Sequence, residues 1–132
     1  MIGLDTNVLV RLVTRDDETQ AQRAKAVFDT HANEEGGLFV ADIVLVELCW
    51  TLGRSYELSR LEIARTVHAL LDNASIALES PSAVKSALTY FEAGSADFPD
   101  CLIIAKASQA GCSHTLSFDR RMGALPGVQL LE

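Results

Sequence analysis

MIGLDTNVLVRLV, residues 1–13, is the stretch of sequence that decides the fold. Its first four residues form a short apolar run, and Asp5 follows directly. Apolar residues then recur at helical spacing, at Val8, Leu9, Leu12 and Val13. This order predicts a buried strand, an acid at the carboxyl end of that strand, and a helix.

The rest of the chain repeats this alternation of short apolar strands and amphipathic helices. Further strands are predicted at 38–41, 76–78, 114–118 and 128–131. Further helices are predicted at 18–31, 43–52, 60–72, 80–93 and 101–110. Strands separated by helices imply parallel crossovers. We therefore predict an α/β fold with one central, mainly parallel sheet of about five short strands, flanked by helices on both faces.

Length and composition limit the classes of protein that this chain can be. Its 132 residues fit one domain, and 48% hydrophobic with 22% charged residues excludes intrinsic disorder. The 3 Cys have no C-x-x-C spacing, which fits reduced thiols in the cytosol. A signal peptide and a membrane span are not recognisable, so we expect a cytoplasmic protein without membrane contact.

The charge balance constrains the partners. There are 11 Lys and Arg against 18 Asp and Glu, which gives a net charge of −7. A polyanion would be repelled by this charge unless local Arg clusters or bound cations reversed it at the site. The surplus of acids therefore needs an explanation.

Glu47 is the most unusual of the acids. It interrupts the apolar run Ile43–Trp50. An unpaired ionised carboxylate is costly to bury, so Glu47 must face solvent on a narrow stripe, pair with a cation or bind a metal. We favour a role in a site over a solvated helix face.

Asp5 and Asp119 each end a predicted strand, and each has a structural alternative. Asp5 can cap the helix that follows it. Asp119 closes the segment 115–119, in which Thr115 and Ser117 project to the same side as the acid. Surface pairing with the two Arg residues that follow Asp119 would explain it equally well.

Two further carboxylates, Asp97 and Asp100, lie three residues apart before the predicted helix 101–110. Asp97 suits an N-cap, and Asp100 suits a position beside the positive end of the helix dipole. Asp100 can also face the same crevice as an acid at a strand end, which makes it the better candidate ligand.

These acids become informative if they converge. Carboxylates packed together raise one another's pKa unless cations compensate. Hard carboxylate oxygens without neighbouring His or Cys select Mg²⁺ or Mn²⁺, and such ions take substrate phosphates as further ligands. Phosphodiester chemistry is the expected use of such a site.

Two other functions fit part of the pattern. The first is a non-catalytic, acidic Mg²⁺-binding receiver or adaptor domain, which gives no account of Glu47. The second is a small-molecule phosphatase, whose usual D-x-D opening is absent because Asn7 stands two residues after Asp5.

Four segments together resemble the PIN-domain ribonucleases, and more narrowly the VapC-type toxins of toxin–antitoxin pairs. They are Ile2-Gly-Leu-Asp5-Thr-Asn-Val-Leu, Val46-Glu-Leu48, Asp100-Cys-Leu-Ile-Ile-Ala-Lys-Ala107 with Gly111 after it, and Thr115-Leu-Ser-Phe-Asp119. The likeness covers nearly the whole chain and depends on the order and spacing of the segments. It implies a single PIN-like nuclease domain over residues 1–132.

The resemblance also implies the site. The acids of the metal pocket would be Asp5, Glu47, Asp100 and Asp119, with Mg²⁺ or Mn²⁺ held mainly by Asp5 and Asp100. The supporting polar residues would be Thr6, Asn7, Thr115, Ser117 and Asp97. Ser117 departs from the family, since many relatives carry Asn there. The implied reaction is metal-assisted hydrolysis of RNA phosphodiesters by the toxin of a type II pair, leaving 5′-phosphate and 3′-hydroxyl ends.

The implied partners are an RNA substrate, a VapB-type antitoxin that blocks the acidic site, and a second copy of the chain in a homodimer. Candidates for contacts with RNA phosphates flank the acids in sequence: Arg11, Arg15, Arg120 and Arg121.

Overall fold

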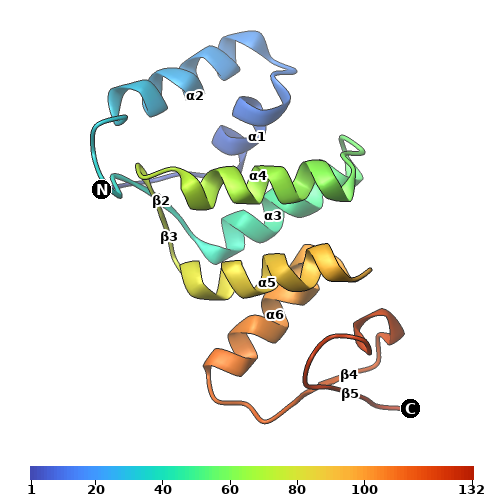
Figure 1. Ribbon diagram of the computed structural model, residues 1–132. Helices are drawn as coiled ribbons and strands as arrows, with labels where there is room; N and C mark the ends of the chain where they lie inside the picture. The colour runs from blue at the N-terminus through green and yellow to red at the C-terminus, as the bar shows by residue number, and fades with distance from the viewer. The chain divides into compact units, whose positions relative to one another are not determined.

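The computed structural model describes residues 1–132, with six α-helices, five short strands and one 3-10 helix (Figure 1). In chain order these are β1 (Ile2–Gly3), α1 (Thr6–Thr14), α2 (Glu18–Thr30), β2 (Leu38–Val40), α3 (Asp42–Arg54), α4 (Arg60–Asp72), β3 (Ile76–Leu78), α5 (Pro81–Ala93), α6 (Phe98–Gln109), β4 (Thr115–Ser117), η1 (Arg120–Met122) and β5 (Val128–Leu130). The chain divides into two compact units, Met1–Pro81 (unit 1) and Ser82–Glu132 (unit 2).

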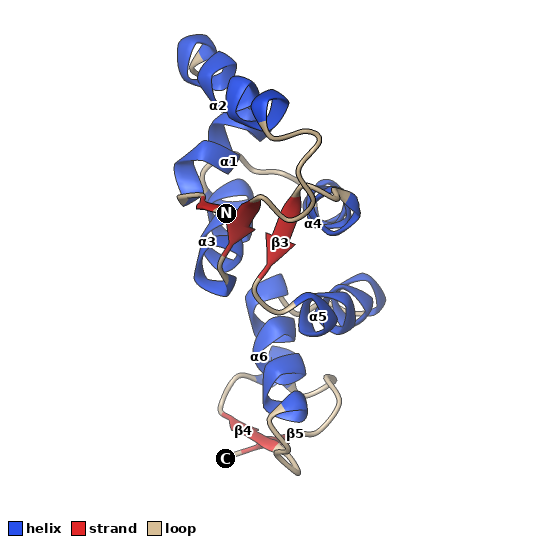
Figure 2. Cartoon of the chain, turned by 90° about the vertical axis from the view of Figure 1, so that its left-hand side faces the viewer, coloured by secondary structure: helices blue, strands red, loops and turns tan.

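Unit 1 contains a three-stranded parallel sheet in the order β1-β2-β3 (Figure 2). Leu38 of β2 pairs with Ile2 on one side and with Ile76 on the other. Because the three strands run in the same direction, their carboxyl ends meet at one edge of the sheet. Asp5 follows β1 at this edge.

The helices of unit 1 bury aliphatic side chains against one another and against the sheet. Helix α1 packs on α2 and α3, and α4 packs on α3 and β3. The large side chains that are almost fully buried are Leu9, Val10, Leu38, Val40, Leu45, Leu48, Leu52 and Val67. Burying one such side chain contributes about 1.5–3 kcal/mol. This packing fixes α1, which Asp5 caps, against α3, which carries Glu47.

Helix α4 begins where its sequence signal predicts. The Ser59 side chain accepts a hydrogen bond from the backbone N–H of Glu62, and the Glu62 carboxylate accepts one from the backbone N–H of Ser59. These two bonds form a capping box and satisfy two backbone donors at the helix start. The prediction of a helix over 60–72 is confirmed.

Unit 2 contains α5, α6 and a two-stranded parallel sheet, β4-β5. Thr115 pairs with Val128, and Ser117 pairs with Leu130. The most buried side chains of this unit are Ala83, Val84, Ala87, Leu88, Phe98, Cys101 and Ala105. The rings of Phe91 and Phe98 meet edge to face at 5.9 Å, which joins α5 to α6.

The predicted α/β class with parallel strands is confirmed. All five predicted strands form, in one sheet of three strands and one of two rather than in a single sheet. Hydrophobic periodicity identifies the short strands, but it does not say which strands pair with each other. Strands of two or three residues also make few hydrogen bonds with their neighbours, so a single sheet is not required. That residues 1–132 form one domain stays a prediction.

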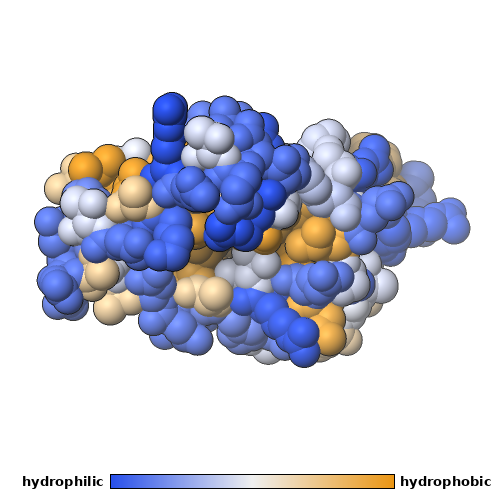
Figure 3. All heavy atoms as spheres, turned by 90° about the horizontal axis from the view of Figure 1, so that it is seen from above, coloured by the Kyte–Doolittle hydropathy of each residue, from blue (hydrophilic) through white to orange (hydrophobic).

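The surface of the protein is mixed in character. Figure 3 shows a face on which hydrophilic side chains predominate and apolar atoms appear in small areas between them. None of the helices combines the length and the apolar character needed to cross a membrane.

Candidate functional site

Thr6 links two of the predicted acids in unit 1. Its backbone N–H donates to Asp5 Oδ1 at 2.8 Å, and its hydroxyl donates to Glu47 Oε1 at 3.1 Å. Thr6 is only 8% exposed, whereas both carboxylates are exposed. Two acids that are far apart in sequence therefore lie on either side of one buried threonine.

The local structure explains the position of Asp5. It occupies the N-cap of α1 with an extended backbone, φ −80° and ψ 158°. The structural and the functional interpretations of Asp5 are thus compatible, because the side chain bonds to the first amide of the helix and remains exposed. Only one of its two oxygens is used in that bond, so the other is available to a ligand.

Glu47 lies on the exposed side of α3. The opposite side of that helix buries Leu45, Leu48 and Leu52. The exposed row contains Ile43, Glu47, Trp50 and Arg54, at the spacing of one helix face. The acid is therefore not a buried charge, and its one hydrogen bond from the protein comes from Thr6.

Two acids at the same sheet edge were not predicted as site residues. Asp42 follows β2 by two residues, and Glu79 follows β3 directly. The Glu79 carboxylate accepts a hydrogen bond from the Asp42 backbone N–H at 2.9 Å, and the Asp42 carboxylate accepts one from the Ser80 hydroxyl at 2.8 Å. The sequence signal that could have identified Asp42 and Glu79 was their position after predicted strands. These bonds tie the start of α3 to the end of β3, which is a structural role.

In unit 2 the charges of Asp97 and Asp119 act on Asp100. Asp100 lies in the first turn of α6 and is half-buried. Burial raises its pKa, and the negative charges of Asp97 and Asp119 raise it further. A carboxyl group in this situation favours a nearby cation.

Arg121 places a positive charge among these acids. Asp119 accepts a hydrogen bond from the Arg121 backbone N–H at 2.9 Å, and the Arg121 guanidinium lies 3.4 Å from the other Asp119 oxygen. The backbone hydrogen bond holds the pKa of Asp119 below its usual value. The predicted alternative for Asp119, pairing with a following Arg, is therefore present. Asp119 can still bind a ligand, because it is only half-buried.

Ser117 fixes the turn that carries Asp119. Its hydroxyl accepts a hydrogen bond from the Asp119 backbone N–H at 2.9 Å and lies 3.5 Å from the sulfur of Met122. Thr115 and Ser117 are half-buried, whereas Leu116 is 53% and Phe118 is 77% exposed. The polar side of β4 is thus the more buried of its two sides.

The remaining supporting residues have simpler surroundings. Asn7 is exposed in the first turn of α1. Asp97 has the backbone geometry of an N-cap, as predicted, but its side chain makes no capping hydrogen bond to α6. Its carboxylate is exposed and contributes to the site through its charge on Asp100.

The two predicted phosphate-binding Arg residues of unit 1 have acidic partners. Arg11 bonds to Asp16 at 2.9 Å, to the Tyr56 hydroxyl at 3.3 Å and to the Gln20 side chain at 2.6 Å. Arg15 pairs with Glu18 at 2.9 Å. The Tyr56 bond is the main cause that raises the pKa of Arg11. Contacts of these two residues with RNA stay a prediction.

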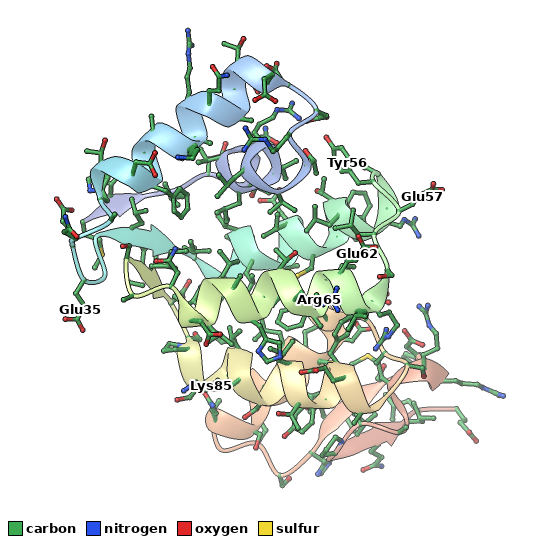
Figure 4. The ribbon with its side chains drawn as sticks, turned by 45° about the horizontal axis from the view of Figure 1, so that its top comes forward. Glu35, Tyr56, Glu57, Glu62, Arg65 and Lys85 are labelled. Atoms are coloured by element: carbon green, nitrogen blue, oxygen red, sulfur yellow. The ribbon has the colours of Figure 1, made fainter.

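One hollow of unit 1 contains none of the predicted acids. It has a volume of about 470 Å³ and is lined by Val13, Thr14, Tyr56, Leu58, Glu62, Arg65 and Thr66. Figure 4 shows Tyr56 on the loop between α3 and α4, with Glu62 and Arg65 on α4. The acids of unit 1 are instead on open surface.

The residue types fit a hard divalent cation. Within neither unit do three or more His, Cys, Asp or Glu side chains form a group that could hold a metal. The predicted ligands are divided two and two, with Asp5 and Glu47 in unit 1 and Asp100 and Asp119 in unit 2. Every one of them is a carboxylate, which is the donor that Mg²⁺ and Mn²⁺ prefer.

Comparison with known proteins identifies similar sequences. A family model for the PIN domain matches residues 2–128. A protein named VapC ribonuclease, from Aquifex aeolicus (strain VF5), is 27% identical over 122 residues, which covers 92% of this chain and 90% of the relative. A solved toxin–antitoxin complex from Klebsiella pneumoniae aligns over 97% of this chain and 94% of that chain, with 19% identity and a TM-score of 0.37. A score of that size does not establish a shared fold.

Proposed function

The chain belongs to the PIN-domain family, and we propose that it is a divalent-metal-dependent endoribonuclease that acts as the toxin of a type II toxin–antitoxin pair. The observation that carries this proposal is the contact of Thr6 with both Asp5 and Glu47, two acids from separate segments of the sequence. The similarity to a protein named VapC ribonuclease supports it.

In this proposal four carboxylates hold Mg²⁺ or Mn²⁺. Asp5 and Asp100 are the principal ligands, and Glu47 and Asp119 complete the set. When bound, the cation would supply positive charge for the phosphate oxygens of RNA and would make a water molecule more acidic. Without it, the anionic substrate and the acids would repel each other.

The residues around the acids have positioning roles. The Thr6 hydroxyl holds Oε1 of Glu47 and thereby leaves Oε2 for a ligand. Ser117 holds the backbone of Asp119 in its turn. Thr115, Asn7 and Asp97 contribute polar or charged surroundings. Arg120 and Arg121 are the proposed phosphate contacts, and their exposure directly after Asp119 supports this role.

The proposed partners and location come from the family resemblance and from the name of the relative. A VapB-type antitoxin would bind the chain and block the acidic site, and two copies of the chain would form a homodimer. The proposed location is the cytoplasm, where both RNA and an antitoxin are available.

Cleavage assays with single carboxylate variants test the reaction. We expect Asp5→Asn and Asp100→Asn each to abolish Mg²⁺- or Mn²⁺-dependent cleavage of labelled RNA while circular dichroism shows an unchanged fold. The matched control is Asp29→Asn, which alters an exposed acid paired with Lys25 on α2 and should cleave like the wild type. Wild-type cleavage by a folded Asp5→Asn or Asp100→Asn protein would reject the assignment.

A growth assay tests the toxin role separately. Expression of the wild-type chain should arrest growth of the host, and co-expression of a small protein from the adjacent gene should relieve the arrest. Sequencing RNA 5′ ends after brief induction would identify the cleavage sites. Absence of both arrest and cleavage in a protein that still binds Mn²⁺ would favour the adaptor domain.

A further inference from the structure

Trp50 presents an exposed aromatic ring next to the proposed site. It lies on α3 three residues after Glu47, which corresponds to an axial rise of about 4.5 Å on the same side of the helix. Trp50 is 57% exposed, although α3 buries its other side in the core of unit 1. Trp50 thus presents a large aromatic ring with one polar N–H beside an acid of the proposed site.

Arg54 follows on the next turn and lies over the same ring. Its guanidinium carbon is 5.7 Å from the centre of the Trp50 ring system, within the range of a cation–π contact. A planar ring has two faces, so a guanidinium over one of them does not occupy the other, and more than half of Trp50 is exposed. Carboxylate, aromatic ring and cation thus succeed one another along one row of α3.

We infer that Trp50 stacks on an unpaired base of the RNA substrate next to the phosphate that is cleaved, and that Arg54 contacts the adjoining phosphate. This inference rests on the proposed function. It narrows the substrate to RNA with unpaired bases at the site, because bases within a duplex are already stacked on their neighbours and offer no free face.

The charge of the chain favours this mode of binding. At a net charge of −7 the protein gains little RNA affinity from long-range attraction. Stacking on an aromatic ring needs no positive charge, and every base offers a face for it. Arg54 adds one local cation at the position where a neighbouring phosphate would lie.

A second copy of the chain is the other occupant to consider, because Ile43 on the same row is 69% exposed. The centre of an interface between copies is depleted of charged residues. The row on α3 instead alternates apolar and charged side chains, with Glu47 between Ile43 and Trp50 and with Arg54 after them. This pattern matches RNA, which combines apolar bases with charged phosphates.

The chain contains 1 Trp, so its fluorescence reports on this position alone. The test uses the full-length Asp100→Asn protein, which we expect to bind RNA without cutting it. We expect an unpaired oligoribonucleotide to quench the Trp50 fluorescence, and the same sequence in a duplex to leave it unchanged. In fluorescence anisotropy with labelled RNA, Trp50→Ala should weaken binding by about 5- to 100-fold. Trp50→Phe should retain most of the affinity, and Arg54→Gln should lose severalfold.

Ile43→Ala is the matched control, since it removes an exposed apolar side chain from the same row and should leave RNA affinity unchanged. RNA binding without quenching, or equal losses in Trp50→Ala and Ile43→Ala, would overturn the inference. So would a Trp50→Ala protein that binds RNA normally but changes its oligomeric state in sedimentation. In these cases the wild type still cuts RNA, whereas a wild type that neither binds nor cuts RNA refutes the proposed function itself.

Discussion

Replacing Thr6 with Val tests whether the site depends on the orientation of Glu47. The substitution removes the hydroxyl but keeps the branched shape and the backbone bond to Asp5. In the native protein the Thr6 hydroxyl donates a hydrogen bond to Glu47 Oε1 at 3.1 Å, and Thr6 itself is only 8% exposed. A hydrogen bond to a charged group contributes about 1.5–3 kcal/mol. Glu47 is exposed and can recruit water instead, so we expect a loss of about 1 kcal/mol.

This loss should appear in catalysis and in stability. A change of about 1 kcal/mol corresponds to a roughly fivefold decrease in kcat/KM for an unpaired RNA substrate, measured with saturating Mn²⁺. The melting temperature should fall by about 3–5 °C. Thr6→Ser keeps the hydroxyl, so its kcat/KM should stay closer to that of the wild type.

A double-mutant cycle separates positioning from general destabilisation. If Thr6 acts through Glu47, then Thr6→Val should have little further effect on cleavage in a Glu47→Gln protein. Fully additive effects of the two substitutions would show that Thr6 does not act through Glu47. Undiminished cleavage by a folded Thr6→Val protein would also refute the reasoning.

Two further predictions concern the cap of α4 and the cation beside Asp119. Ser59→Ala should lower the melting temperature at neutral pH by about 4 °C. The backbone N–H of Ser59 holds the pKa of Glu62 below its usual value in the folded state, and the Ser59 side chain lowers it further. Ser59→Ala keeps the backbone contribution and removes only that of the side chain, which is complete above the unfolded pKa and is lost as the pH falls through the folded pKa. The difference in melting temperature should therefore narrow in acid, and a constant difference would contradict this account. Arg121→Gln should raise the affinity for Mn²⁺ about two- to fivefold in calorimetric titrations, because the guanidinium competes for Asp119. Weaker binding of Mn²⁺ would show that Arg121 instead supports the site.

The elements that local signals define could be predicted to the residue. The capping box at Ser59 gave the start of α4, and the strand at 76–78 has the predicted bounds. Helix α3 was harder, since it was predicted over 43–52 and continues through Gly53 to Arg54. A Cβ at Gly53 would lie 3.5 Å from the Ile63 side chain of α4, so this glycine is at a helix contact. Such contacts depend on tertiary packing, which local signals do not contain.

The residues of the candidate site could be predicted from the sequence, but the contacts between them could not. The sequence identifies Asp5 and Glu47 as candidate acids and Thr6 as a supporting residue, but the hydrogen bond from Thr6 to Glu47 exists only because α1 packs on α3. The apolar run around Glu47 left three possibilities for its carboxylate, which were a narrow solvated stripe, a cation partner or a bound metal. In the structure the run has two sides, and Trp50 is on the same exposed side as the acid. The helical period was not readable from a stretch in which nearly every residue is apolar.

The pairing of Lys and Arg side chains explains why an acidic chain would use divalent ions and an aromatic ring to bind RNA. Three of the four basic residues between Thr6 and Thr30 are engaged with neighbouring acids: Arg11 with Asp16, Arg15 with Glu18, and Lys25 with Asp29. Each such pair cancels its own charge and attracts a phosphate only weakly. In this proposal divalent ions on the carboxylates supply positive charge at the reacting phosphate, and Trp50 adds affinity through an uncharged surface. Arg54, Arg120 and Arg121 add only local charge at neighbouring phosphates. In this proposal the acids that give the chain its charge of −7 are also what bring cations to the substrate.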